Sequence, residues 1–238
     1  MIVSVHQPQY LPWIGYFDKI DKSDCFVFLD TVQYKPREFQ NRNKICVKGG
    51  WLWLTVPVNV KGHYKQSILD VEIDNEKAWN AKHKKNLISW YGNTQFFNTY
   101  FPFFEEVYNK KWNKLVDLNV MIIKYLLEKL KTDRPVYFES EIGTTKMGTD
   151  RIIEICQKLR ANTYLSGIGG KDYLEEEKFL KAGITLKYQE FNHPTYRQHY
   201  ESQTQSFQPY MSVIDLLFNE GTRSIDIIRE AQGRGIPG

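Results

Sequence analysis

The sequence predicts an α/β protein built on a mainly parallel sheet, with a helical insertion. Short apolar runs alternate with amphipathic segments at both ends of the chain, and strands that alternate with helices predict a parallel sheet covered on both faces. Residues 76–131 show only helical patterning. The chain has 238 residues, of which 42% are hydrophobic, and this is enough for one large domain with a sizeable core.

The first predicted elements are a strand, a turn, a helix and a second strand. Residues 1–5 and 25–29 are the two apolar runs. Between them, apolar side chains recur at a spacing of three to four over residues 10–22, which predicts a helix. A turn rich in proline and aromatic residues opens this helix. In a parallel sheet such a turn lies at the carboxyl ends of the strands, where ligands bind.

The other elements are predicted from their apolar patterning and turn residues. Ser212 is a predicted N-cap and Gly221 a predicted C-cap of one helix. We expect residues 1–232 to form a single Rossmann-like α/β domain with the helical insertion at about 76–131, followed by a tail at 233–238. The predicted elements are a hairpin within 44–58, strands at 68–73, 135–138, 163–166 and 184–188, and helices at 76–91, 95–109, 111–131, 149–159, 171–180, 211–219 and 222–232.

Composition disfavours several classes of protein. The net charge is only +4 and the longest basic tract is residues 82–85, which disfavours nucleic-acid binding. No apolar run approaches the ~20 residues that a membrane-spanning helix needs, and no signal peptide is evident, so we expect a cytoplasmic protein without membrane insertion. Three dispersed cysteines argue against disulfides or a zinc cluster, and the five histidines lack metal-ligand spacing, so no metal is assigned.

The turn at residues 6–17 is the first candidate site. His6 ends the first strand and is the candidate catalytic acid or base. Gln7 offers both a donor and an acceptor to a substrate. Tyr10 and Gly15 belong to the same turn and are candidate substrate-binding residues. The alternative is structural, with the histidine capping the turn and the glycine packing a helix against a strand.

Residues 13–16 have the placement of the His-Ile-Gly-His motif of adenylating enzymes and nucleotidylyltransferases. In those enzymes the two histidines bind ATP phosphates beside the first helix. Here Trp13 and Tyr16 stand in place of both histidines. The resemblance is therefore one of layout. It makes ATP a candidate cofactor but leaves the cofactor open.

A polar block at residues 30–44 is the second candidate site. Asp30 ends the second predicted strand, and Gln33, Asn41 and Arg42 follow among other amides and cations. Such a density of amides and cations is typical of a site for phosphate or carboxylate. The alternative is a solvated loop.

A glycine-rich turn at residues 166–171 is the third candidate site. Ser166, Gly167, Gly169 and Lys171 follow a predicted strand, and backbone amides in such a turn can hold an anion. The spacing is not that of a P-loop, and a flexible turn is the alternative. The three candidate sites are expected to converge on one pocket at the carboxyl edge of the sheet.

Taken together, the motifs of this chain closely resemble those of the WbqC-like protein family. The resemblance extends from residue 1 to about 231, and the residues that carry it are His6-Gln-Pro-x-Tyr-Leu-Pro-Trp-x-Gly-Tyr-Phe-x-Lys-Ile20, Asp30-x-Val-Gln33, Gln40-Asn-Arg-Asn-Lys-Ile45, Leu54-Thr-Val-Pro-Val58, Tyr164-Leu-Ser-Gly167 and Met211-Ser-Val-Ile-Asp-Leu-Leu-Phe-Asn219. It implies a role in bacterial surface-polysaccharide (O-antigen) biosynthesis, acting on an amino sugar or a nucleotide-linked sugar. The polar stretch at 202–206 is a candidate local loop variation.

Our leading hypothesis is a transferase or ligase that forms an amide or ester on a sugar-linked substrate by acyl or aminoacyl transfer. The expected partner is a small-molecule nucleotide-linked sugar. The rival hypothesis is a non-catalytic protein of the same pathway that binds a nucleotide sugar or assists assembly. Nucleic-acid binding is a third hypothesis, disfavoured by the low net charge. The sequence leaves the donor, the acceptor and the oligomeric state open.

Overall fold

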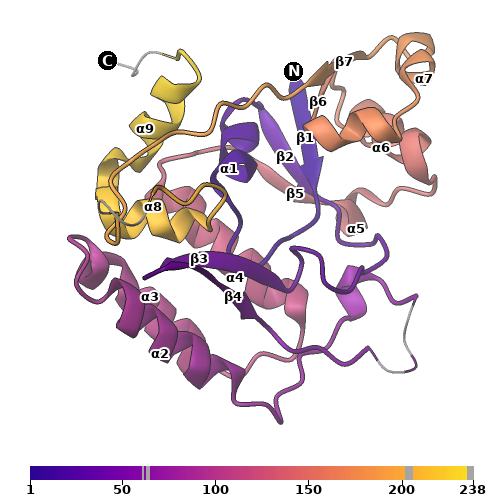
Figure 1. Cartoon of the computed structure of the whole chain (residues 1–238). Coiled ribbons are helices and arrows are strands. Elements are labelled where there is room, and N and C mark those ends of the chain that lie inside the picture. Colours follow the sequence, from indigo (N-terminus) through magenta and orange to yellow (C-terminus); the bar gives the residue numbers. More distant parts are fainter. Residues whose placement is uncertain (61, 63–64, 202–205, 235–238) are drawn as a thin grey trace. The chain divides into compact units, whose positions relative to one another are not determined.

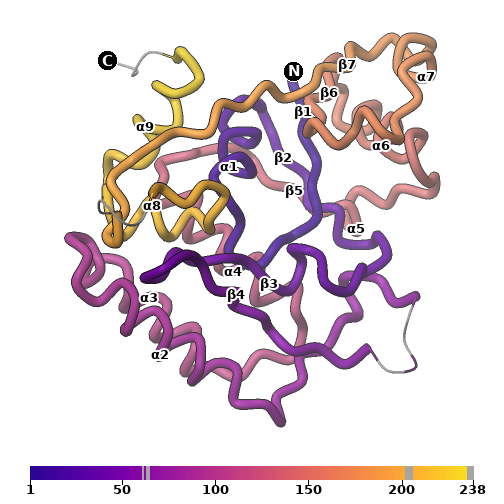
Figure 2. The backbone as a smooth tube through the Cα atoms, viewed as in Figure 1, coloured from indigo at the N-terminus to yellow at the C-terminus, as the bar shows by residue number. Residues whose placement is uncertain are grey.

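The computed structural model describes residues 1–60, 62, 65–201 and 206–234. Most of the polar stretch at 202–206 and of the predicted tail at 233–238 lies outside these residues. The chain divides into two compact units, and Figure 2 lets the reader follow the backbone through them. The first unit comprises Met1–Pro8, Gly15–Val32 and Thr132–Phe191, and the second comprises Gln9–Ile14, Gln33–Lys131 and Asn192–Gly238.

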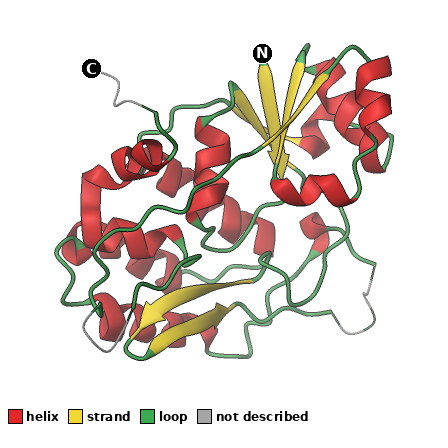
Figure 3. Ribbon diagram, turned by 45° about the horizontal axis from the view of Figure 1, so that its top comes forward, coloured by secondary structure: helices red, strands yellow, loops and turns green. Residues whose placement is uncertain are grey.

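A five-stranded parallel sheet forms the centre of the first unit (Figures 1 and 3). This confirms the predicted α/β class with a mainly parallel sheet. In spatial order the strands are β5 (Val136–Phe138), β2 (Cys25–Phe28), β1 (Ile2–His6), β6 (Thr163–Ser166) and β7 (Thr185–Tyr188). The three central strands, β2, β1 and β6, are largely buried, whereas the edge strands β5 and β7 are partly exposed.

Helices cover both faces of this sheet, as expected for a parallel sheet. On one face, Val3 and Val5 of β1 pack in a core with the apolar side chains of α6 (Gly148–Lys158) and Phe179 of α7 (Glu176–Lys181). On the other face lies α1 (Ile14–Asp21). There the ring of Tyr16 packs edge-on against that of Phe26. Two shorter helices complete the unit, α5 (Glu139–Ile142) and the 3₁₀ helix η2 (Ile168–Asp172).

The order of the strands creates a switch point beside β1. From β1 the chain adds β2 and then β5 on one side, whereas β6 and β7 lie on the other side. The connections that leave β1 and β6 therefore diverge toward opposite edges of the sheet. In open α/β sheets, ligands bind at such a point, just beyond the carboxyl ends of the two strands.

The second unit contains a hairpin and most of the helices. The antiparallel hairpin joins β3 (Arg42–Val47) to β4 (Gly50–Thr55), as predicted. Aromatic rings dominate the core; the rings of Phe97 and Phe101 stack with centroids 4.4 Å apart. The helices are α2 (Trp79–Tyr91), α3 (Phe97–Asn109), α4 (Leu115–Lys129), α8 (Val213–Glu220) and α9 (Ser224–Ala231), with 3₁₀ helices η1 (Ile68–Asp70) and η3 (Gly221–Arg223).

The predicted caps of α8 are confirmed. The Ser212 hydroxyl accepts a hydrogen bond from the Ile214 amide at 3.4 Å, and Gly221 ends the helix at a φ of 60°. Such a positive φ favours glycine because a Cβ would be strained there. Within the described residues, no helix combines the length and the apolar character that crossing a membrane requires.

Three predicted elements differ from the structure for local reasons. The helix predicted from residue 10 begins at Ile14, because Leu11 has a φ of 47° and Pro12 disfavours helical geometry in the residue before it. The strand predicted at 68–73 is instead a 3₁₀ turn in which the Ser67 hydroxyl donates to the Asp70 carboxylate at 2.8 Å. The helix predicted at 171–180 is split between η2 and α7.

Candidate functional site

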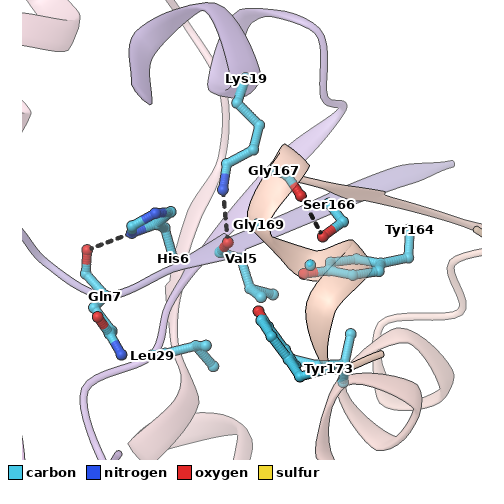
Figure 4. A pocket seen from close by; sticks show the side chains of 12 residues that line it. Val5, His6, Gln7, Lys19, Leu29, Tyr164, Ser166, Gly167, Gly169 and Tyr173 are labelled. Atoms are coloured by element: carbon cyan, nitrogen blue, oxygen red, sulfur yellow. Dashed lines mark hydrogen bonds between the residues drawn. The ribbon is translucent and has the colours of Figure 1, made fainter. Parts of the chain in front are cut away.

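A pocket of about 230 Å³ lies at the carboxyl ends of β1 and β6, within the first unit (Figure 4). Its position is the switch point of the sheet. Side chains from β1, α1, α6 and β6 reach it, together with the backbone of η2. The lining residues are Val5, His6, Gln7, Lys19, Leu29, Ile152, Tyr164, Ser166, Gly167, Gly169, Gly170 and Tyr173.

His6 presents a neutral imidazole to this pocket. Its Nδ1 lies 3.2 Å from the Gln7 carbonyl oxygen, so we assign the proton to Nδ1 and leave Nε2 as an acceptor. The Tyr16 hydroxyl donates to the same carbonyl at 3.2 Å, and the Tyr16 ring contacts the imidazole edge-on with centroids 5.0 Å apart. Burial, and then the charge of Lys19, lowers the pKa of His6 to about 3. The imidazole therefore stays uncharged through the physiological pH range.

Lys19 brings a buried amine to the same pocket. The residue is only 2% exposed, and its Nζ donates to the Val5 carbonyl oxygen at 3.0 Å. In the part of the chain that the structure describes, Lys19 forms no ion pair; the adjacent Asp18 carboxylate pairs instead with Lys22 at 2.8 Å. Burial lowers the pKa of Lys19 to about 7. Near neutral pH this amine is therefore poised between its charged and uncharged forms.

The glycine-rich turn after β6 forms the facing wall. The Gly167 carbonyl accepts hydrogen bonds from the Ser166 hydroxyl at 3.0 Å and from the Gly170 amide at 2.9 Å. A Cβ at Gly170 would lie 2.0 Å from the Ser166 Oγ and 2.9 Å from a methyl carbon of Leu174, so a side chain there would have to displace these neighbours. Glycine at this position allows the turn to fold tightly against Ser166, and its backbone then borders the pocket directly.

The chemistry of the lining is that of a site for an electron-rich group. None of the twelve lining residues is an aspartate or a glutamate. The polar groups are an imidazole, an amine, an amide, hydroxyl groups and backbone, which together offer several hydrogen-bond donors. Within the described ranges, no cluster of three or more histidine, cysteine, aspartate or glutamate side chains is arranged to hold a metal ion.

Five of the residues that the sequence singled out line this pocket together: His6, Gln7, Ser166, Gly167 and Gly169. Two of the three loops that were expected to converge therefore do so. The contributions come from neighbouring strands, β1 and β6, whose residues pair directly in the sheet.

Three further candidates of the first unit have other contacts and do not line the pocket. The Gly15 carbonyl accepts a hydrogen bond from the Gln189 side chain at 2.9 Å. The buried Asp30 carboxylate accepts from the Ser140 amide and hydroxyl, at 3.0 and 2.6 Å, at the start of α5. Lys171 has its amine 5.2 Å from the centre of the Tyr188 ring.

The remaining four candidates belong to the second unit. Tyr10 is buried, and its hydroxyl bonds to His83 Nδ1 at 2.8 Å and to the Tyr108 hydroxyl at 2.7 Å. Gln33 forms an isolated antiparallel bridge with Ser67. Asn41 donates to the Val56 carbonyl at 2.8 Å, and the Arg42 guanidinium stacks 4.3 Å above the centre of the Trp53 ring.

Sequence reasoning missed Lys19, although a signal for it exists. Tyr16, Lys19 and Ser23 are spaced by three and four residues, so they share one face of the first helix. The structure buries that face: the Ser23 hydroxyl donates to the Ser4 hydroxyl of β1 at 2.7 Å. A lysine on the same helical face as a buried aromatic residue could have been identified as a candidate.

These features define an α/β protein with a polar pocket at the switch point of a parallel sheet. The sequence matches the model of the WbqC-like protein family over residues 7–227, so the chain belongs to this family. It is also 32% identical over 230 residues to "Uncharacterized protein Rv1507c" of Mycobacterium tuberculosis (strain ATCC 25618 / H37Rv), an alignment that covers 95% of this chain and 97% of that protein. No solved structure matches the chain. The family resemblance inferred from the sequence is thereby confirmed.

Proposed function

We propose that this protein is an enzyme that transfers an acyl or aminoacyl group to an amino or hydroxyl group of a nucleotide-linked sugar. The observation that carries the proposal is the pairing of a neutral imidazole, His6, with a buried amine, Lys19, in a pocket at the sheet's switch point. Perturbed titratable groups that share a pocket are typical of catalytic sites.

The reaction would proceed by attack of the sugar's amine or hydroxyl on the acyl carbonyl carbon. A bond forms from that nitrogen or oxygen to the carbonyl carbon, and the bond from this carbon to its leaving group breaks, with the electron pair departing on the leaving group. Nε2 of His6 accepts the proton that the nucleophile loses. General-base catalysis of this kind contributes about 10²–10⁴-fold to a rate.

The low pKa of His6 sets a condition on this role. At about 3 it makes the imidazole a weak base in the unliganded protein, since a base works best when its pKa lies near the operating pH. One cause of the lowering is the charge of Lys19. A negatively charged substrate beside Lys19 would offset that charge and raise the pKa of His6, so the base would strengthen when substrate is bound.

The size of the pocket indicates which part of the substrate it takes. Its volume of about 230 Å³ is below the ~300–1,000 Å³ typical of sites that enclose a whole drug-sized ligand. The pocket therefore suits the reacting portion of a substrate better than an entire nucleotide sugar. Gln7, Ser166 and the glycines of the turn line the pocket, and we expect them to bind that portion.

The biological setting follows from the family resemblance. It supports a cytoplasmic reaction in bacterial surface-polysaccharide biosynthesis, O-antigen included, because nucleotide-linked sugars are the activated units from which such polymers are built. ATP is the candidate source of energy if the acyl group must first be activated.

The test is a transfer assay with purified full-length protein. The protein is incubated with ATP, an amino acid or acyl donor, and a UDP- or dTDP-linked amino sugar, and products are followed by mass spectrometry. We expect the sugar to gain the mass of the acyl group. His6→Gln should lower the rate by about 10²–10⁴-fold, whereas His199→Gln, which changes an exposed histidine of the second unit, should not. Tight binding of the sugar nucleotide without any product would instead support a non-catalytic binding protein.

A further inference from the structure

Among the residues that the structure describes, no side chain of opposite charge contacts the amine of Lys19. Its Nζ donates to one backbone carbonyl, that of Val5, and no carboxylate pairs with it in the described part of the chain. The pocket that it lines contains no acidic residue. A buried ammonium group without a counter-charge is unfavourable, and proteins generally keep such groups only where something else compensates the charge.

The twelve described residues that line the pocket supply no negative charge to this amine. From β1 the lining group is the imidazole of His6, from β6 the hydroxyls of Tyr164 and Ser166, and beyond η2 the hydroxyl of Tyr173. Burial raises the pKa of Tyr164, and tyrosine hydroxyls ordinarily lose their proton only at about pH 10, so both hydroxyls stay protonated. From α6 only Ile152 lines the pocket.

On α1 the carboxylate adjacent to Lys19, that of Asp18, is paired with other side chains. The Asp18 carboxylate contacts the Lys22 amine at 2.8 Å, and the Gln189 side chain donates to Asp18 at 2.7 Å. The glycine turn lies against the amine, since the position of a Cβ on Gly167 is 4.0 Å from Nζ. On this side the ammonium group of Lys19 therefore faces the backbone of Gly167, which has no side chain to fill the space.

From this geometry we infer that Lys19 binds an oxyanion of the substrate, either a phosphate oxygen of the nucleotide-linked sugar or a carboxylate of the acyl donor. The inference rests on the proposed function in taking this pocket as the substrate site. Phosphate and carboxylate are both complementary to what the site offers: a cation, the tyrosine hydroxyls of the lining and a compact backbone turn, without a repelling carboxylate among the lining residues.

Binding of an oxyanion here should be linked to uptake of a proton. Burial holds the pKa of Lys19 at about 7 in the unliganded protein, so about nine-tenths of the amines are neutral at pH 8 and about one-tenth at pH 6. An oxyanion favours the charged form. An anion that does not itself titrate in this range should therefore bind about 10-fold more tightly at pH 6 than at pH 8.

Isothermal titration calorimetry of the full chain provides the test. The probes are sulfate, acetate and UDP-N-acetylglucosamine, none of which titrates between pH 6 and 8. Each titration is repeated in buffers that differ in ionisation enthalpy, which counts the protons taken up. The wild type should take up close to one proton at pH 8 and much less at pH 6. Tight binding of sulfate and the sugar nucleotide with weak binding of acetate would identify the bound oxyanion as a phosphate. Tight binding of acetate with weak binding of the other two probes would identify it as a carboxylate.

Variants separate the charge of Lys19 from a merely structural role. Lys19→Met should weaken binding at least 10-fold at pH 6 and abolish proton uptake. Lys19→Arg retains a charge that does not titrate, and it should restore binding without the pH dependence. Lys181→Met changes an exposed amine on α7 and should match the wild type. Circular dichroism verifies that each variant is folded.

Two results would overturn the inference: unchanged binding by a folded Lys19→Met protein, or no binding of any probe to the wild type at either pH. The outcome is distinguishable from that for the proposed function. Binding through Lys19 without transfer in the mass-spectrometric assay would refute the proposed function and leave the inference in place. Normal transfer by the Lys19→Met protein would refute the inference that Lys19 binds the substrate and leave the proposed function in place.

Discussion

Replacing Lys19 with methionine should stabilise the unliganded protein. The amine is 2% exposed and forms no ion pair among the described residues, and burial lowers its pKa from 10.5 to about 7. Between these two values the unfolded chain binds more protons than the folded chain. The buried amine of Lys19 therefore destabilises the folded protein most below pH 7, and this destabilisation disappears as the pH rises past 10.5.

The size of this effect follows from the lowered pKa. A fall from 10.5 to about 7 corresponds to a free-energy cost of about 5 kcal/mol at pH 6. Methionine removes that cost but also the hydrogen bond from Nζ to the Val5 carbonyl, which is worth about 1 kcal/mol. The variant should therefore be more stable by roughly 2–4 kcal/mol at pH 6, and the advantage should fall to about 1 kcal/mol at pH 9.

Urea denaturation of the wild type and the Lys19→Met variant at pH 6 and pH 9 measures these differences. Lys181→Met is the matched control, because it removes an exposed amine from the same unit. Equal stability of Lys19→Met and wild type at pH 6 would show that Lys19 carries no costly buried charge. So would a stabilisation of the same size at both pH values, since that would reflect better packing and not the removal of a charge.

Three further substitutions test other parts of the structure. His6→Gln should lower the kcat/KM of acyl transfer by about 10²–10⁴-fold with little change in melting temperature; undiminished transfer would exclude His6 as the base. Gly170→Ala places a Cβ 2.0 Å from the Ser166 Oγ, so it should cost about 1–3 kcal/mol in urea denaturation and weaken binding of whichever oxyanion probe the wild type binds; wild-type behaviour in both would contradict the tight turn. Tyr196→Phe removes a 2.6 Å hydrogen bond to the buried Asp215 and should cost about 1–3 kcal/mol, a prediction that unchanged stability would contradict.

The parallel sheet could be predicted because its three central strands, β2, β1 and β6, are largely buried on both faces. Strands of this kind are short continuous apolar runs, such as residues 25–28, and they stand out between polar turns. The structure places β6 beside β1, although about 160 residues separate them. Sequence patterning signals that both are strands but not that they are neighbours, because pairing depends on the packing of the whole unit.

The candidate site could be predicted only in part, because some residues have roles that depend on distant partners. Tyr10 lies in the opening motif, but its hydroxyl bonds to residues more than 70 positions away in the second unit. Asp30 follows a strand as a ligand-binding residue would, yet it accepts hydrogen bonds from Ser140.

Lys19, the most informative residue of the pocket, was missed because its burial depends on tertiary packing. A lysine is commonly exposed, so Lys19 resembled a surface residue of an amphipathic helix. Its burial follows from the packing of α1 against β1, where the Ser23 and Ser4 hydroxyls meet. Such packing is a tertiary property that the helical spacing permits but does not require.

A crystal structure of the protein grown with a UDP-linked amino sugar would show whether the pocket is the substrate site. We expect ligand density in the pocket at the carboxyl ends of β1 and β6, with an oxyanion within hydrogen-bond distance of Lys19 Nζ and the reacting amine or hydroxyl near His6 Nε2. A ligand bound at another surface, with this pocket empty in the same crystals, would contradict this expectation.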